Sequence, residues 1–220
     1  MKSNFDEELY KFFLTREIVH SGEVDFPSRN NENISGIDAM MLSYNQDFWG
    51  LFGRLRTGLI VENELWDGIQ QNIDGIQHDI DKIEIKSKFH ANVFLQFKVP
   101  DFITTSNGTE YGLWNQSYYR YKINKNQNNS LSVLENKVGS TALVAYACPA
   151  TNKYDMLKQY DNNNSVAINS NFARPSEFVG HSAYTFIAAD LDGKAHSKIS
   201  EIKPLKLFDE IKKLDSSESF

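Results

Sequence analysis

Cysteine, long apolar runs and excess basic charge are all scarce in this sequence. Its 220 residues include one cysteine, so no internal disulfide can form, and no closely spaced Cys/His quartet offers a zinc site. No apolar stretch is long enough to span a bilayer, and the acidic N-terminus lacks the apolar core of a signal peptide. We therefore expect a cytoplasmic protein with no membrane partner.

Basic residues are outnumbered, with 23 Lys and Arg against 29 Asp and Glu and a formal net charge of -6. This excess of acids argues against a protein that coats nucleic acid by bulk electrostatic attraction. A local basic cleft is still compatible with it, because a few basic side chains and a divalent cation can supply the positive charge that a phosphodiester substrate needs.

Several common catalytic motifs are also missing. No Gly-rich phosphate loop followed by Lys-Ser/Thr is present, and no serine lies in a GxSxG pattern. Cys148, inside "YACPA", is most simply a small buried hydrophobe. The histidines are scattered, and no two of them form an i, i+4 metal-binding pair: His20, His78, His90, His181 and His196.

Apolar residues make up 40% of the chain, which suffices for one sizeable core. We expect a single domain over residues 1–220 with a loose tail at 215–220. Helical and strand patterns alternate, which predicts a mixed α/β domain with a central sheet flanked by helices. The first expected helix begins at Phe5 and ends near Ser21-Gly22, and the others cover 131–136, 153–160 and 204–214. The expected strands or extended segments cover 36–44, 92–99, 117–123, 141–150, 165–172 and 182–190.

Residues 46–90 interrupt this alternation. Their second half has apolar residues every three or four positions, which predicts a helix of several turns, weakened by Gly68 and Gly75. We interpret the whole segment as a helical insertion that serves for dimerisation or for clamping a partner.

The strand at 92–99 has polar residues inside an apolar pattern. Alternation places Phe94, Gln96 and Lys98 on one face and Val93, Leu95 and Phe97 on the other. Burying a carboxamide and an ammonium beside a phenylalanine is costly unless both have partners. An acid such as Asp38 would stabilise them, and a site for a divalent cation and a phosphate would explain them better.

The acid in "GID" and the later "QFK" resemble the restriction-endonuclease-like superfamily, the PD-(D/E)XK nucleases, in a variant with Gln in place of Glu. In that family a helix precedes a β-meander, the second strand carries the Asp, the third carries (E/Q)-x-K, and a helix and a further strand follow. "LQFK" also resembles uncharacterised bacterial proteins suspected of being nucleases. The resemblance implies a DNA-cleaving enzyme and a role in bacterial anti-phage defence as part of a larger system.

The resemblance also implies a role for each matching residue. Asp38 would bind Mg²⁺ or Mn²⁺ through its carboxylate, Gln96 would supply a neutral oxygen ligand, and the backbone carbonyl of Phe97 would be a further ligand. Lys98 would orient the attacking water and offset charge in the transition state. A helical acid often completes such sites, and the candidates are Glu17 and Glu32, between which the sequence does not choose.

Each of these residues also has a structural interpretation. Asp38 can be a strand-edge or turn acid, Gln96 can bond to backbone, Lys98 can extend to solvent from a strand end, and Glu17 can lie on a solvated helix face. The tyrosines of 117–123 can stack on bases or form cross-strand aromatic pairs, and we favour the pairs. The alternative function is a non-catalytic subunit with a nuclease-like fold that binds a protein partner, a second copy or nucleic acid through 46–90 and the tyrosine strand.

Overall fold

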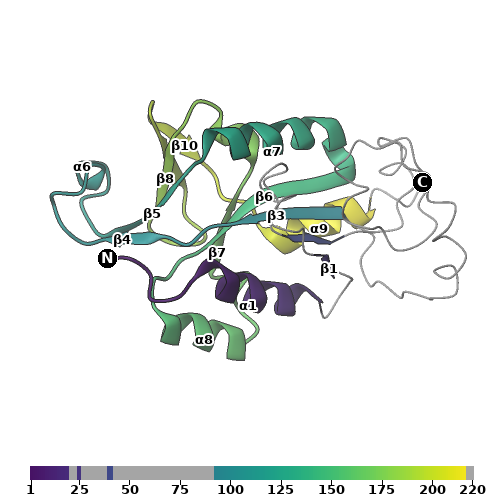
Figure 1. The fold of residues 1–220 in the computed structure, drawn as a ribbon, viewed down its shortest axis with the longest axis horizontal. Coiled ribbons are helices and arrows are strands. Elements are labelled where there is room, and N and C mark those ends of the chain that lie inside the picture. The colour runs from purple at the N-terminus through teal and green to yellow at the C-terminus, as the bar shows by residue number, and fades with distance from the viewer. Residues whose placement is uncertain (20–23, 26–38, 42–91, 217–220) are drawn as a thin grey trace, which may run out of the picture.

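The computed structural model describes residues 1–19, 24–25, 39–41 and 92–216, which form two β-sheets and the helices that cover them (Figure 1). The first sheet, sheet A, has the order β1-β2-β3-β6-β7, with β1 Val24–Asp25, β2 Ala39–Met41, β3 Asn92–Phe97, β6 Ala142–Pro149 and β7 Ser170–Ala173. Sheet B has the order β10-β9-β8-β5-β4, with β4 Asp101–Ile103, β5 Tyr118–Lys122, β8 Ala183–Phe186, β9 Gly193–His196 and β10 Ser200–Ile202.

Sheet A is mixed, whereas every pairing in sheet B is antiparallel. In sheet A, β2 runs antiparallel to β1 and β3, β6 runs parallel to β3, and β7 runs antiparallel to β6. The two parallel strands are buried along their whole length. Parallel strands covered on both faces need such continuous apolar sequences, and "ALVAYACP" in β6 is an example. The predicted mixed α/β class is therefore confirmed.

Helices cover both faces of sheet A. Figure 1 shows α7 on one side of β3 and β6, and α1 with α8 on the other. The helices are α1 Glu7–Val19, α6 Tyr111–Trp114, α7 Lys125–Val138, α8 Tyr154–Asn162 and α9 Leu207–Ser216, with short 3-10 turns η1 Gly139–Thr141 and η2 Pro175–Phe178. Among the described helices, none is both long enough and apolar enough to pass through a lipid bilayer.

Two buried clusters separate according to strand alternation. Phe94, Val144 and Tyr146 face α7 and sheet B, where Leu131 and Leu134 of α7 join them. Val93, Leu95, Phe97 and their neighbours in β6 face the helices α1, α8 and α9, in a cluster with Tyr10, Leu14, Leu157 and Ile211. The two faces predicted for 92–99 are thus confirmed.

The aromatic residues of sheet B join it to sheet A. The ring of Tyr121 in β5 lies 5.4 Å from that of Tyr184 in β8, and Tyr119 lies 4.8 Å from Phe102 in β4. Phe178 bridges the sheets, with its centroid 5.3 Å from Tyr146 and 5.1 Å from Tyr184. The interpretation of "SYYRYKI" as a strand with cross-strand aromatic pairs is confirmed.

Cys148 lies in the same core and is fully buried. Burial raises the pKa of its thiol well above the ordinary value. It is therefore the buried hydrophobe that the sequence indicated, and its thiol is protonated at neutral pH.

Two predicted segments need correction. The helix expected at 131–136 begins earlier, at Lys125, because Asn124 caps it by accepting hydrogen bonds from the backbone N–H groups of Asn126 and Gln127 at 3.0 and 3.3 Å. The extended segment expected at 165–172 is wrong for 166–169, which form turns. Val166 and Ala167 of these turns are buried in the cluster that contains α1, whereas Ile168 is exposed.

The remaining predicted elements either correspond to observed ones or lie outside the described residues. The first expected helix is α1, which ends at Val19, and the strands expected at 92–99 and 141–150 are β3 and β6. Helix α9 continues to Ser216, so the start of the predicted tail is helical, while 217–220 lie outside the described residues. The predicted insertion at 46–90 also lies outside them.

Candidate functional site

The candidate site lies where β3 ends beneath the first turn of α7. Gln96, the fifth residue of β3, is 1% exposed, so its carboxamide needs partners within the protein. Its Oε1 accepts a hydrogen bond from Nε2 of Gln127 at 2.7 Å, and its own Nε2 donates to the backbone carbonyl of Phe97 at 3.0 Å. These contacts explain how a polar side chain is accommodated in this face of the sheet.

Lys98 follows β3 directly and points to the same region. Its backbone N–H donates to the carbonyl of Ala147 at 2.8 Å, which continues the pairing of β3 with β6. Its Nζ donates to Oε1 of Gln127 at 2.8 Å and lies 5.8 Å from the ring centroid of Tyr146. A lysine ammonium at that distance from an aromatic face gains a cation–π attraction. The structure therefore brings Gln96 and Lys98 together.

Gln127 is a site residue that the sequence analysis missed. It lies in the first turn of α7, and its backbone N–H is held by the Asn124 side chain. The pattern of Asn124 followed three residues later by Gln was an available signal, because an N-cap residue with Glu or Gln at the third helical position marks a helix start. Read in that way, it would have placed a polar side chain in the first turn of α7.

Asp38 and Glu32 lie outside the described residues, so their places relative to Gln96 are not part of this geometry. The sequence joins Asp38 directly to Ala39, the first residue of β2. Ala39 pairs with Leu95, the residue before Gln96. The role of Asp38 therefore stays a prediction from the sequence.

Glu17 has a different environment. Its Oε2 accepts hydrogen bonds from the backbone N–H groups of Val166 and Ala167, at 2.6 and 3.1 Å. Burial raises the pKa of its carboxyl group, and the two amides partly oppose that shift. Because α1 packs on the face of sheet A opposite to Gln96, the described contacts give Glu17 the task of holding the turns at 166–169. The structure does not bring it together with Gln96 and Lys98.

The donor chemistry fits a hard divalent cation in part. Oε1 of Gln96 and the carbonyl of Phe97 are oxygens, the ligand atoms that Mg²⁺ and Mn²⁺ prefer, but neither carries a charge. Within the described ranges, no group of three His, Cys, Asp or Glu side chains could hold a metal by itself. A carboxylate would have to join these oxygens, and Asp38 is the residue that the sequence offers.

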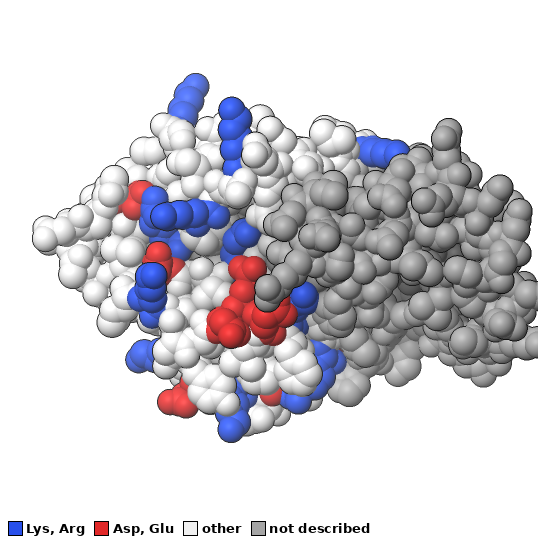
Figure 2. All heavy atoms as spheres, viewed as in Figure 1, with Lys and Arg blue, Asp and Glu red and all other residues white. Residues whose placement is uncertain are grey.

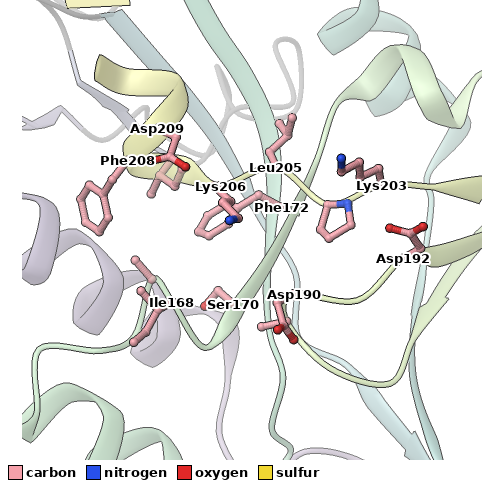
Figure 3. A pocket seen from close by; sticks show the side chains of 14 residues that line it. Ile168, Ser170, Phe172, Asp190, Asp192, Lys203, Leu205, Lys206, Phe208 and Asp209 are labelled. Carbon is pink, nitrogen blue, oxygen red and sulfur yellow. The ribbon is translucent and has the colours of Figure 1, made fainter. Parts of the chain in front are cut away.

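A separate cavity of about 390 Å³ lies beside β7 and the start of α9 (Figure 3). Phe172 and Leu205 supply apolar surface, and charged residues of both signs surround it, including Asp190, Asp192 and Lys203. The cavity is lined by neither Gln96 nor Lys98. It is therefore a second concave region, distinct from the site at the end of β3.

The face of the molecule seen in Figure 2 carries charges of both signs. Figure 2 shows basic residues spread over the visible face and acidic residues grouped near its middle. This mixture agrees with the net charge of -6. On this face, attraction for a polyanion would come from single basic side chains rather than from a continuous basic patch.

Known proteins give no independent indication of function. No family model matches this chain, and neither a curated protein nor a solved structure matches it. The functional inference consequently depends on the residues and contacts described above.

Proposed function

We propose that this chain is a metal-dependent nuclease that hydrolyses DNA phosphodiester bonds and has a restriction-endonuclease-like core. The order of elements in sheet A supports this. A helix, α1, precedes the antiparallel strands β1, β2 and β3. After β4, α6 and β5, which intervene in the chain, α7 leads to β6, which pairs parallel with β3. This is the order that the resemblance implies, with "QFK" beginning in the third strand.

The observation that carries the proposal is the shared position of Gln96 and Lys98. Both side chains contact the same residue, Gln127, at 2.7 and 2.8 Å. A buried carboxamide next to an ammonium places an oxygen ligand and a positive charge in one small region. Phosphodiester hydrolysis needs both, because charge develops on the phosphate oxygens in the transition state.

Each residue then has a defined task. Gln96, the Phe97 carbonyl and Asp38 would hold a divalent cation, which supplies Lewis-acid polarisation of the phosphate when bound. Lys98 stabilises negative charge on the phosphate and orients the attacking water. The Tyr146 ring beside Nζ limits the positions that this ammonium can take.

A cleavage assay tests this proposal. The protein is incubated with plasmid, linear duplex, single-stranded DNA and RNA, with Mg²⁺ or Mn²⁺ and with chelator, and the variants Lys98→Ala and Asp38→Ala are compared. Lys158→Ala, an exposed position on α8, is the matched control. We expect metal-dependent cleavage that both site variants abolish and the control retains. Cleavage that survives Lys98→Ala and Asp38→Ala would remove the proposed site.

A second candidate is a non-catalytic subunit that keeps this core and binds nucleic acid, a protein partner or a second copy. The observation in its favour is that the side chains of Gln96 and Lys98 both form hydrogen bonds with Gln127, which gives each of them a structural role. Under this alternative the cleavage assay shows no cleavage. A binding assay with labelled DNA then shows either binding, or no binding together with a stable oligomer in sedimentation. A place in bacterial defence is compatible with both candidates and rests on the resemblance.

A further inference from the structure

Gln127 links the two proposed site residues through both ends of its carboxamide. Nε2 donates to Gln96 and Oε1 accepts from Lys98. We propose that Gln127 is a positioning residue that fixes which atom of the Gln96 carboxamide, oxygen or nitrogen, is presented beside Lys98. This inference deepens the proposed function and rests on it for its consequence in metal binding.

The carboxamides of Gln96 and Gln127 lie in a row between the Phe97 carbonyl and the Lys98 ammonium. The chemistry of these two end groups decides how both carboxamides are oriented. A lysine ammonium can only donate hydrogen bonds, so the atom of Gln127 that faces Lys98 has to be Oε1. Nε2 of Gln127 then faces Gln96, which has to present its oxygen. The other end is equally restricted, because the Phe97 carbonyl can only accept and therefore takes Nε2 of Gln96.

A reversed Gln96 carboxamide would be unfavourable at its contacts with Gln127 and with the Phe97 carbonyl. Its NH₂ group would face the NH₂ group of Gln127, and its oxygen would face the Phe97 carbonyl. At 1% exposure the side chain has almost no access to water that could compensate for these losses. Lys98 therefore fixes the orientation of the Gln127 carboxamide, and Gln127 in turn favours one orientation of the Gln96 carboxamide.

The consequence concerns the proposed cation. A carboxamide oxygen has two lone pairs, so it can accept from Gln127 and also ligate a metal, whereas a carboxamide nitrogen carries two hydrogens and repels cations. Helix α7 holds Gln127 in place through the Asn124 cap and through the buried residues Leu131 and Leu134. The helix therefore sets the ligand atom that the strand offers.

Gln127→Glu separates this role from simple electrostatics. A glutamate keeps an acceptor for Lys98 but faces Gln96 with an acceptor too, which favours reversal of the Gln96 carboxamide. The added negative charge by itself would strengthen cation binding, whereas reversal would weaken it. Gln159→Glu makes the same charge change at an exposed position on α8 and is the control.

Mn²⁺ binding by titration calorimetry and side-chain NOEs from the Gln96 NH₂ group are the two readouts. We expect Gln127→Glu and Gln127→Leu to weaken Mn²⁺ binding about 10-fold or more, the usual loss for a residue that orients a ligand, with Gln159→Glu unchanged. In Gln127→Glu the Gln96 NH₂ protons should move toward residue 127. Unfolding curves establish that the variants fold.

The two proposals fail in different ways. Unchanged or tighter Mn²⁺ binding by Gln127→Glu, or NOEs identical to those of the wild type, would overturn the positioning role and leave the nuclease proposal standing. A wild-type protein that binds no Mn²⁺ and cleaves no DNA would overturn the nuclease proposal. The NOEs would then still decide whether Gln127 sets the orientation of Gln96.

Discussion

Gly193, the first residue of β9, lies directly against the ring of Tyr184. A Cβ atom built at this position would be 2.0 Å from the Tyr184 hydroxyl oxygen and 2.1 Å from Cζ. The ring has no space to move into, because it is fully buried and packs against Phe178 and Tyr121 with centroids 5.1 and 5.4 Å away. Gly193→Ala is therefore expected to strain the core between the two sheets.

The size of this effect can be worked out. Overpacking a well-filled core costs about 1 to 3 kcal/mol of unfolding free energy. In a domain of this length each kcal/mol lowers Tm by about 2 to 4 °C, so Gly193→Ala should lower Tm by about 2 to 12 °C. Thermal and urea unfolding followed by circular dichroism measure it. The change matters for the site because the same cluster packs α7, which carries Gln127, against β3.

Gly112 provides the control, since a Cβ built there meets no atom within 4 Å. Gly112→Ala should leave stability unchanged or raise it by up to about 1 kcal/mol, because alanine favours the helical backbone. The cost of Gly193→Ala should also shrink in a Tyr184→Leu background, where the ring is gone. If Gly193→Ala were as stable as Gly112→Ala, the packing of β9 on Tyr184 described above would be refuted.

Two further predictions concern the helix ends. Burial raises the pKa of Glu17 above 4.5, so its contribution to stability is fully present below the unfolded pKa and is lost as pH rises through the folded pKa. Glu17→Gln cannot titrate, so its unfolding free energy relative to that of the wild type should rise between about pH 4 and pH 7, as measured by urea unfolding. A difference in unfolding free energy that does not change with pH would contradict the raised pKa of Glu17. Asn124→Ala removes the acceptor for two amides of α7 and should cost about 0.5 to 2 kcal/mol in the same assay. Asn124→Asp should cost little, and an equal loss in both variants would argue against a capping role.

The strands at the centre of the fold could be predicted because their chemistry is local. Apolar residues fill β6 without interruption, and in β3 the alternation of faces correctly put Gln96 and Lys98 on one side. The partner of these two residues was not predictable in the same way. Asparagine-rich sequence before Leu131 resembles a loop, yet the Asn124 cap and burial of one helix face begin α7 at Lys125.

Sheet B shows the limit of pattern recognition for short strands. β9 and β10 have four and three residues, too few for alternation to stand out from loop sequence. They form because β9 pairs with β8 and β10 pairs with β9, and these pairings are tertiary contacts. The turns at 166–169 illustrate the same limit, because Val166 and Ala167 are buried in turns held by Glu17, from a helix about 150 residues away in the chain.

The most direct test of the central claim is a crystal structure of the protein soaked in Mn²⁺, with the metal located by anomalous scattering. The account predicts a peak about 2.0 to 2.2 Å from Oε1 of Gln96, with a carboxylate oxygen of Asp38 as a second ligand and Lys98 beside it. A peak elsewhere, with none at Gln96, would contradict the claim that the end of β3 is a metal-dependent active site.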